Sequence, residues 1–145
     1  MITTRRLASP TDHRDASRMP VTYELDSPTI IVSLEGIYET AEVRAAVLAA
    51  VADPRAAGAT GLLFDVRHSA SIASRTAAEV RAMADFLAVT AEQFGRRLAL
   101  VADSDAAFGL MRLGSVAVEQ KGVDTRVFRD ISDAEGWLSA RPGAA

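Results

Sequence analysis

Cysteine is absent from this 145-residue chain. The absence excludes disulfide bonds, thiolate metal ligands and a cysteine nucleophile. It also fits a reducing cytoplasm, where we expect the protein to lie. Lysine is nearly absent as well, because Lys121 is the one lysine among sixteen basic residues. The arginines that supply the other positive charges are scattered through an alanine-rich sequence, which indicates biased composition rather than phosphate recognition.

The chain also lacks a basic excess and long apolar runs. Its formal net charge of −3 argues against general affinity for nucleic acid, which requires a basic face. No run approaches the roughly 18–20 apolar residues that cross a bilayer, so we expect no membrane span. With 49% apolar residues, the composition is that of a globular domain with one core.

The first twenty residues show no hydrophobic periodicity and are rich in Thr, Ser, Asp, Arg and Pro. We expect residues 1–20 to be a disordered tail, residues 21–140 to be one domain, and residues 141–145 to be frayed.

Two alternating segments open the domain. Apolar and polar residues alternate in residues 21–26 and again in residues 30–34, on either side of Ser27-Pro28. This two-residue period with a short turn predicts a β-hairpin. A helix capped by Thr40 follows and weakens at Asp53-Pro54.

The middle of the chain changes character. Residues 62–64 and 98–102 are continuous apolar runs, which are typical of central parallel strands buried on both faces. Between them, Thr76 and Glu79 form a capping box for an amphipathic helix that Gly95 ends. A third helix is predicted over 106–120, a short strand over 126–128, and a last helix capped by Ser132 with Glu135.

The resulting order is β-β-α-β-α-β-α-β-α. Strand–helix–strand alternation implies parallel pairing through right-handed crossovers, and the opening hairpin adds an antiparallel edge. The sequence therefore predicts a single α/β domain with a mixed, mostly parallel sheet and helices packed on it.

Three segments carry a family resemblance: TYELDSPTIIVSLEG, GLLFDVRHSASIASRTAAEV and RVFRDISDAEGWLSA. Through them, residues 21–140 resemble a STAS domain, the fold of bacterial anti-sigma-factor antagonists, and more narrowly its SpoIIAA-like branch. The resemblance implies regulation through a protein partner. Antagonists of the well-studied kind carry an Asp-Ser-Ser-Gly element with a phosphorylated serine. Here residues 73–76 stand in its place and retain Ser74 alone, which makes Ser74 the phosphorylation candidate.

The strand-to-helix segment 65–76 is the best candidate site, because ligands and partners of open α/β sheets bind at the carboxyl ends of strands. Free amides at the helix start, with Arg67 or Arg75, could hold a phosphate or carboxylate. The alternative is that these polar residues only cap the helix and face solvent. The candidates for binding a partner or phosphate are Asp65, Arg67, His68, Ser69, Ser71, Ser74, Arg75 and Thr76.

Nothing in this segment predicts an enzyme. His68, Asp65 and Ser69 are the residue types of a triad, but adjacent residues rarely reach triad geometry. The other histidine, His13, lies in the tail, so we expect no metal site and no cofactor. Residues Asp103, Ser104 and Asp105 follow the next strand and could join the same site or bind Mg²⁺, although a helix cap is the simpler interpretation.

The predicted helix 106–120 is apolar on more than one face. Either it has two buried faces, or it presents an apolar patch to a protein partner, a second copy of the chain or a lipid-like ligand. Gly109 and Gly114 would permit close approach of another backbone. The patch residues are Phe108, Leu110, Met111 and Leu113.

Two functional hypotheses result. The first is a non-enzymatic STAS-like interaction module that binds a protein partner at residues 65–76, with possible control by phosphorylation and possible homodimerisation. The second is a small carrier or sensor of an apolar ligand bound near residues 106–120.

Overall fold

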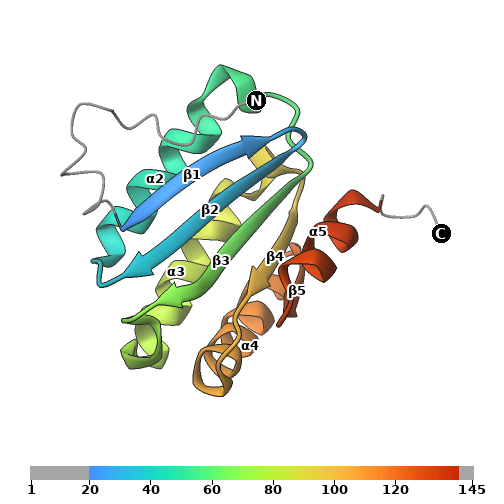
Figure 1. Ribbon diagram of the computed structural model, residues 1–145. Coiled ribbons are helices and arrows are strands. Elements are labelled where there is room, and N and C mark those ends of the chain that lie inside the picture. Colours follow the sequence, from blue (N-terminus) through green and yellow to red (C-terminus); the bar gives the residue numbers. More distant parts are fainter. Residues whose placement is uncertain (1–19, 141–145) are drawn as a thin grey trace.

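The computed structural model describes residues 20–140, so the tail predicted at 1–20 (apart from Pro20) and residues 141–145 lie outside the described part. Five strands form one sheet in the order β1-β2-β3-β4-β5. Strand β1 is antiparallel to β2, and the remaining neighbours are parallel (Figure 1). The α/β class and the mixed sheet predicted from the sequence are confirmed.

The elements follow the predicted order along the chain. The strands are β1 (Val21–Asp26), β2 (Thr29–Gly36), β3 (Gly61–Ser69), β4 (Arg97–Val101) and β5 (Asp124–Phe128). The helices are α2 (Thr40–Ala52), α3 (Ala77–Thr90), α4 (Asp105–Glu119) and α5 (Ile131–Ser139). Short 3-10 segments in the connections are η3 (Pro54–Ala56), η4 (Ile72–Ser74) and η5 (Ala91–Phe94).

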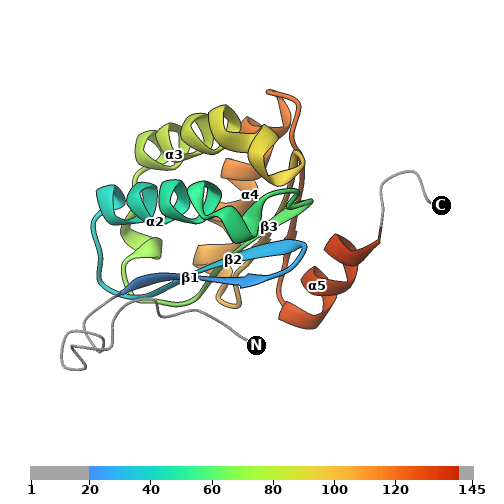
Figure 2. The same cartoon turned by 90° about the horizontal axis from the view of Figure 1, so that it is seen from above.

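Both faces of the sheet are covered, but unequally. Helices α2, α3 and α4 lie on one face and α5 lies alone on the other (Figure 2). Leu62, Phe64, Leu98 and Leu100 face the three helices in the main core. The alternate strand residues Leu63, Ala99 and Val101 form a second cluster with Ala134 and Leu138 of α5. The central strands are apolar throughout because both of their faces are buried.

Arg97 of β4 binds α5 and so connects this helix to the sheet. The Arg97 guanidinium is buried and lies over the Trp137 ring, 4.1 Å from its centroid. It donates hydrogen bonds to the carbonyl oxygens of Trp137 at 3.1 Å and Ala140 at 2.9 Å. The last carbonyl groups of a helix have no intrahelical partner, so Arg97 supplies hydrogen bonds that the helix itself does not.

Two predicted helix caps are wrong by one or two residues. Thr40 is the first residue of α2, and the N-cap is Glu39, whose amide donates to the Glu42 carboxylate at 2.9 Å. Helix α5 is capped by Asp130, which accepts from the Ser132 amide at 2.7 Å. In each case an acidic residue one or two positions before the predicted cap takes its place.

The connection from α3 to β4 depends on a glycine. Gly95 has φ +73°, a conformation that L side chains rarely adopt, and a Cβ there would lie 2.8 Å from the Thr60 Cα. The sequence prediction that Gly95 ends this segment agrees with its left-handed conformation.

We therefore expect Gly95→Ala to lower the free energy of unfolding by at least about 1–2 kcal/mol, through backbone strain and the contact with Thr60. The matched control is Gly109→Ala, because Gly109 lies within α4 with open space around it. This control should gain about 0.5–1 kcal/mol of stability. Urea unfolding of both variants measures the difference, and equal midpoints would contradict the assignment.

Candidate functional site

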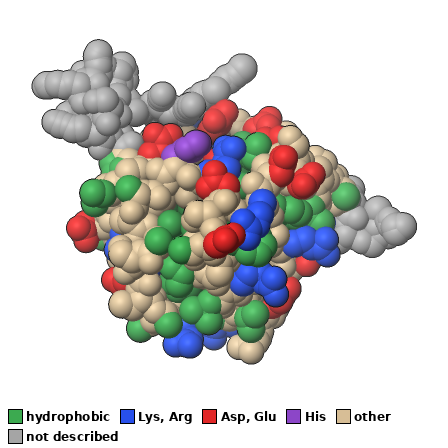
Figure 3. All heavy atoms as spheres, turned by 60° about the horizontal axis from the view of Figure 1, so that its bottom comes forward, with side chains coloured by type: hydrophobic (Ala, Val, Ile, Leu, Met, Phe, Trp, Pro, Cys, Tyr) green, Lys and Arg blue, Asp and Glu red, His purple; other side chains and the backbone are tan. Residues whose placement is uncertain are grey.

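The carboxyl ends of β2, β3 and β4 meet at one edge of the sheet, and Figure 3 is turned to bring this edge forward. Acidic and basic side chains lie there among hydrophobic ones. Strand β3 extends further than the sequence suggested, because pairing with β2 continues to Gly36–Ser69 after a register shift between Ser33 and Glu35. Residues 65–69 of the predicted loop are therefore strand, and the loop proper begins at Ala70.

Asp65 and Arg67 form an ion pair within this strand. The Asp65 carboxylate is buried and accepts from Arg67 Nε at 2.9 Å and Nη2 at 2.8 Å, and also from the Arg67 amide at 3.0 Å. The hydrogen bonds to Asp65 raise the pKa of the Arg67 guanidinium. The negative charges of Asp103 and Asp130 raise it further. Arg67 is thus paired with the Asp65 carboxylate, which competes with a phosphate for the same guanidinium group.

Removing Arg67 should destabilise the fold. In Arg67→Met, the Asp65 carboxylate would stay buried without its cation, and we expect unfolding to require about 2–3 kcal/mol less. Arg81→Met is the control, because Arg81 is exposed on α3; it should change stability by less than about 0.5 kcal/mol. The comparison is made by urea unfolding. A small effect of Arg67→Met would show that the pair contributes no more than a surface ion pair.

Ser69, at the end of β3, also has a structural role. Its hydroxyl is 2.7 Å from the Tyr38 hydroxyl and accepts from the Ile72 amide at 3.0 Å. His68 is exposed, whereas the carboxylate of Asp65 is taken up by Arg67. The hydrogen bonds of Asp65 and Ser69 thus go to residues other than His68, and the three do not form a triad.

The other loop residues divide into caps and exposed groups. Thr76 accepts from the Glu79 amide at 3.1 Å, which confirms the predicted capping box. Ser74 is exposed, and its hydroxyl donates to the Ser71 carbonyl at 2.9 Å. Arg75 donates to the Tyr38 carbonyl and lies over the Tyr38 ring, 5.1 Å from its centroid.

The segment after β4 reaches the same edge. Ser104 caps α4 by accepting from the Ala107 amide at 3.1 Å, as the simpler interpretation predicted. Asp105 pairs with Arg129 at 3.0 Å, and Asp103 is exposed. Within residues 20–140, no group of three or more His, Asp or Glu side chains could hold a metal ion.

Helix α4 has two packed faces, which accounts for its apolar sequence. It contacts α3 on one side and β5 on the other. Met111 is buried, whereas Phe108 and Leu110 are partly buried against the core. Leu113 is partly buried as well. Gly114 faces α3, where a Cβ would lie 3.1 Å from Val80 Cγ1, so it is the glycine of α4 that allows close helix packing.

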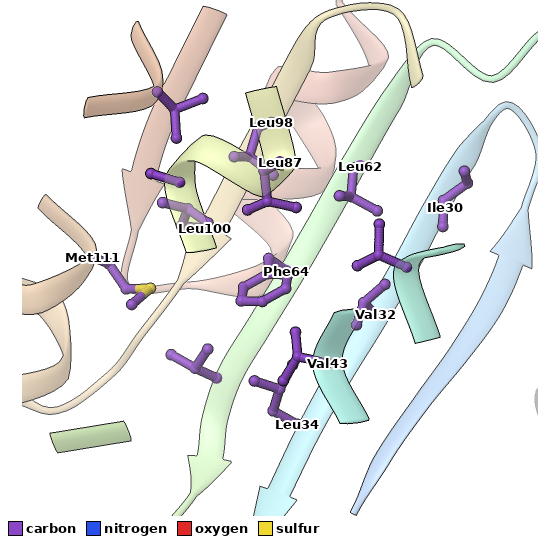
Figure 4. Packing of buried hydrophobic residues seen from close by; sticks show 14 of the residues in the cluster. Ile30, Val32, Leu34, Val43, Leu62, Phe64, Leu87, Leu98, Leu100 and Met111 are labelled. Atoms are coloured by element: carbon purple, nitrogen blue, oxygen red, sulfur yellow. The ribbon is translucent and has the colours of Figure 1, made fainter. Parts of the chain in front are cut away.

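A cavity of about 60 Å³ lies between the sheet and helices α2, α3 and α4, and it is partly open to the surface. Its lining is almost wholly apolar, with Thr40, Arg75 and Glu79 as the polar side chains other than the Tyr38 hydroxyl. Figure 4 shows part of the wall, where Phe64 of β3, Leu100 of β4 and Met111 of α4 lie close together. The floor is the sheet and the roof is α3.

The sequence hypothesis placed an apolar ligand near residues 106–120, but most of the cavity wall comes from elsewhere. Met83 and Leu87 of α3, Leu34 of β2 and Tyr38 line it together with Met111. The apolar stripe of α3 was visible in the sequence as an ordinary core face. The spacing of apolar residues along α3 predicts which face is buried, but it does not predict whether that face packs tightly or leaves a cavity.

No family model matches the chain, and comparison with the curated proteins and with the solved structures finds no match. Among the described helices, none combines the length and apolarity that a bilayer crossing requires.

Proposed function

We propose that this chain is a non-enzymatic binding domain that holds a small apolar ligand in the cavity between α3, α4 and the sheet. The observation that supports the proposal is the cavity itself, of about 60 Å³ with apolar walls. Protein interiors are otherwise closely packed, and at about 24 cal/mol per Å³ a void of this size costs roughly 1–2 kcal/mol. A ligand that fills it would recover that free energy.

The walls suit a ligand of adaptable shape. Met83 and Met111 both line the cavity, and unbranched methionine side chains adjust to irregular apolar groups. An apolar wall also makes bound water a poor occupant, since a water molecule needs two to four polar partners. A short alkyl chain meets these conditions.

We expect primary alkanols to bind with an affinity that rises about fourfold for each added methylene until the cavity is full, because each buried methylene contributes about 0.8 kcal/mol. A series from butan-1-ol to octan-1-ol, followed by NMR of the Met83 and Met111 methyl groups, measures this dependence. Shifts should be largest at these two methyl groups because both line the cavity.

The variant that tests the location is Ala84→Leu, because Ala84 lines the cavity and is buried. It should abolish alkanol binding and leave the fold intact. Ala82→Leu adds the same volume on the exposed side of α3 and should bind as the unchanged chain does. Binding that survives Ala84→Leu would place the ligand elsewhere, and an absence of binding in the unchanged chain would exclude the proposed function.

A second candidate is the STAS-like interaction module predicted from the sequence. It is favoured by exposed His68, Ser74 and Asp103, which belong to neighbouring segments at the carboxyl edge of the sheet. The side chains of Asp65, Arg67, Ser69, Arg75 and Thr76 all have partners within the fold, which makes this candidate the weaker one.

This candidate predicts phosphate on Ser74 in protein isolated from its own cells, and a co-purifying protein that Asp103→Lys releases. Phosphopeptide mapping with quantitative mass spectrometry measures both. Glu135→Lys, at an exposed position of α5, is the control and should leave the partner bound. If Ser74 carries no phosphate and no co-purifying protein is released by Asp103→Lys, this function is excluded.

A further inference from the structure

Two charged side chains, Arg75 and Glu79, border the apolar cavity, and Arg75 is the cation of the two. Arg75 lines the cavity, and its side chain is held by donation from Nη2 to the Tyr38 carbonyl and, more weakly, to Ser71 Oγ at 3.4 Å. Its Nε atom is buried and has no hydrogen-bond partner within residues 20–140. No carboxylate of the described residues forms an ion pair with it.

Arg97 also has a buried Nε without a hydrogen bond, but unlike Arg75 it has an anionic partner. Arg97 donates to two carbonyl oxygens and also lies 3.8 Å from the Asp124 carboxylate. The charge of Arg97 is therefore balanced within the fold. Arg75 is half-buried and has carbonyl, hydroxyl and ring contacts, but it has no anionic partner among the described residues.

The remaining polar groups at the cavity limit which class of ligand could supply an anion for Arg75. The Glu79 carboxylate also borders the cavity, but it accepts from the Thr76 amide at 2.8 Å and forms no ion pair with Arg75. Its negative charge would repel a ligand with anionic groups at more than one position. A ligand with a single small anionic head and an apolar body is thus complementary to this wall.

We propose that the cavity binds a monocarboxylate with an alkyl tail. Its carboxylate binds the part of the Arg75 guanidinium that borders the cavity, and its tail lies against Phe64, Met83 and Leu100. An ionised acceptor on a guanidinium forms a strong, charge-assisted hydrogen bond, and no carboxylate of the described residues takes that role at Arg75. The inference rests on the proposed function, because it specifies the head group of a ligand for that cavity.

The test compares octanoate with octan-1-ol on the full chain, using the Met83 and Met111 methyl signals. The two probes share an alkyl chain and differ in the head group. Octanoate should bind at least tenfold more tightly, and Arg75→Met should remove this preference while leaving alkanol binding in place. Arg75→Lys, which keeps the charge and loses the planar fork, should retain part of the preference. Arg81→Met, on the exposed face of α3, is the control and should retain all of it.

The outcomes separate the two proposals. Equal affinity for octanoate and octan-1-ol would overturn the carboxylate assignment and leave the apolar cavity as the binding site. Failure of both probes to shift the methyl signals would overturn both. A preference for octanoate that survives Arg75→Met would place the head group elsewhere, and tighter binding of octyl sulfate than of octanoate would overturn the choice of a carboxylate. The comparison in the unchanged chain remains decisive if Arg75→Met fails to fold.

Discussion

Burial of the central strands on both faces is the constraint on which the rest of this structure depends. Leu62 and Leu63 are adjacent in β3 and fully buried on opposite faces, and β4 repeats the arrangement with Leu98 and Ala99. Neither strand can be stable with one face in water, so the chain must supply a layer on each side. Three helices form one layer, whereas a single nine-residue helix, α5, forms the other.

The layer formed by α5 alone needs stabilising contacts beyond apolar packing, whereas the layer of α2, α3 and α4 does not. Helix α5 buries few side chains, so packing alone gives it limited support. Arg97 compensates from β4 by binding the end of the helix and stacking on Trp137. On the opposite face, α3 rests on the sheet through Val80, Ala84 and Leu87, and the small Ala84 leaves space beneath the helix. The cavity is therefore a consequence of covering a wide sheet with helices that carry small residues.

The sequence predicted the order of elements because the signals for it are local. A two-residue period, a continuous apolar run and a capping box each depend on neighbouring residues, and β1, β3 and α3 appear where those signals lie. Features that depend on contacts between distant segments were not predictable in this way. The extension of β3 to Ser69 requires pairing with β2, and the caps of α2 and α5 were each misplaced by one or two residues.

The candidate site shows the same difference between local features, which the sequence predicts, and long-range contacts, which it does not. The polar composition of residues 65–76 was a correct signal that this segment is unusual, but it did not reveal where each side chain points. Asp65 and Arg67 are partners of each other, and Ser69 is bound to Tyr38, a residue 31 positions away. Arg75, which the sequence allowed as a surface residue, lines an apolar cavity. Its direction is set by the Tyr38 carbonyl, a contact that no local pattern encodes.

Tyr38 connects the two candidate sites. Its hydroxyl is bonded to Ser69, its carbonyl accepts from Arg75, and its ring lies beneath the Arg75 guanidinium. The η4 turn that carries Ser74 lies between Ser69 and Arg75, and both are attached to Tyr38. Both ends of the segment that displays Ser74 are therefore bonded to the same residue. The cavity and the carboxyl edge share this hydrogen-bonded unit, since Tyr38 also lines the cavity.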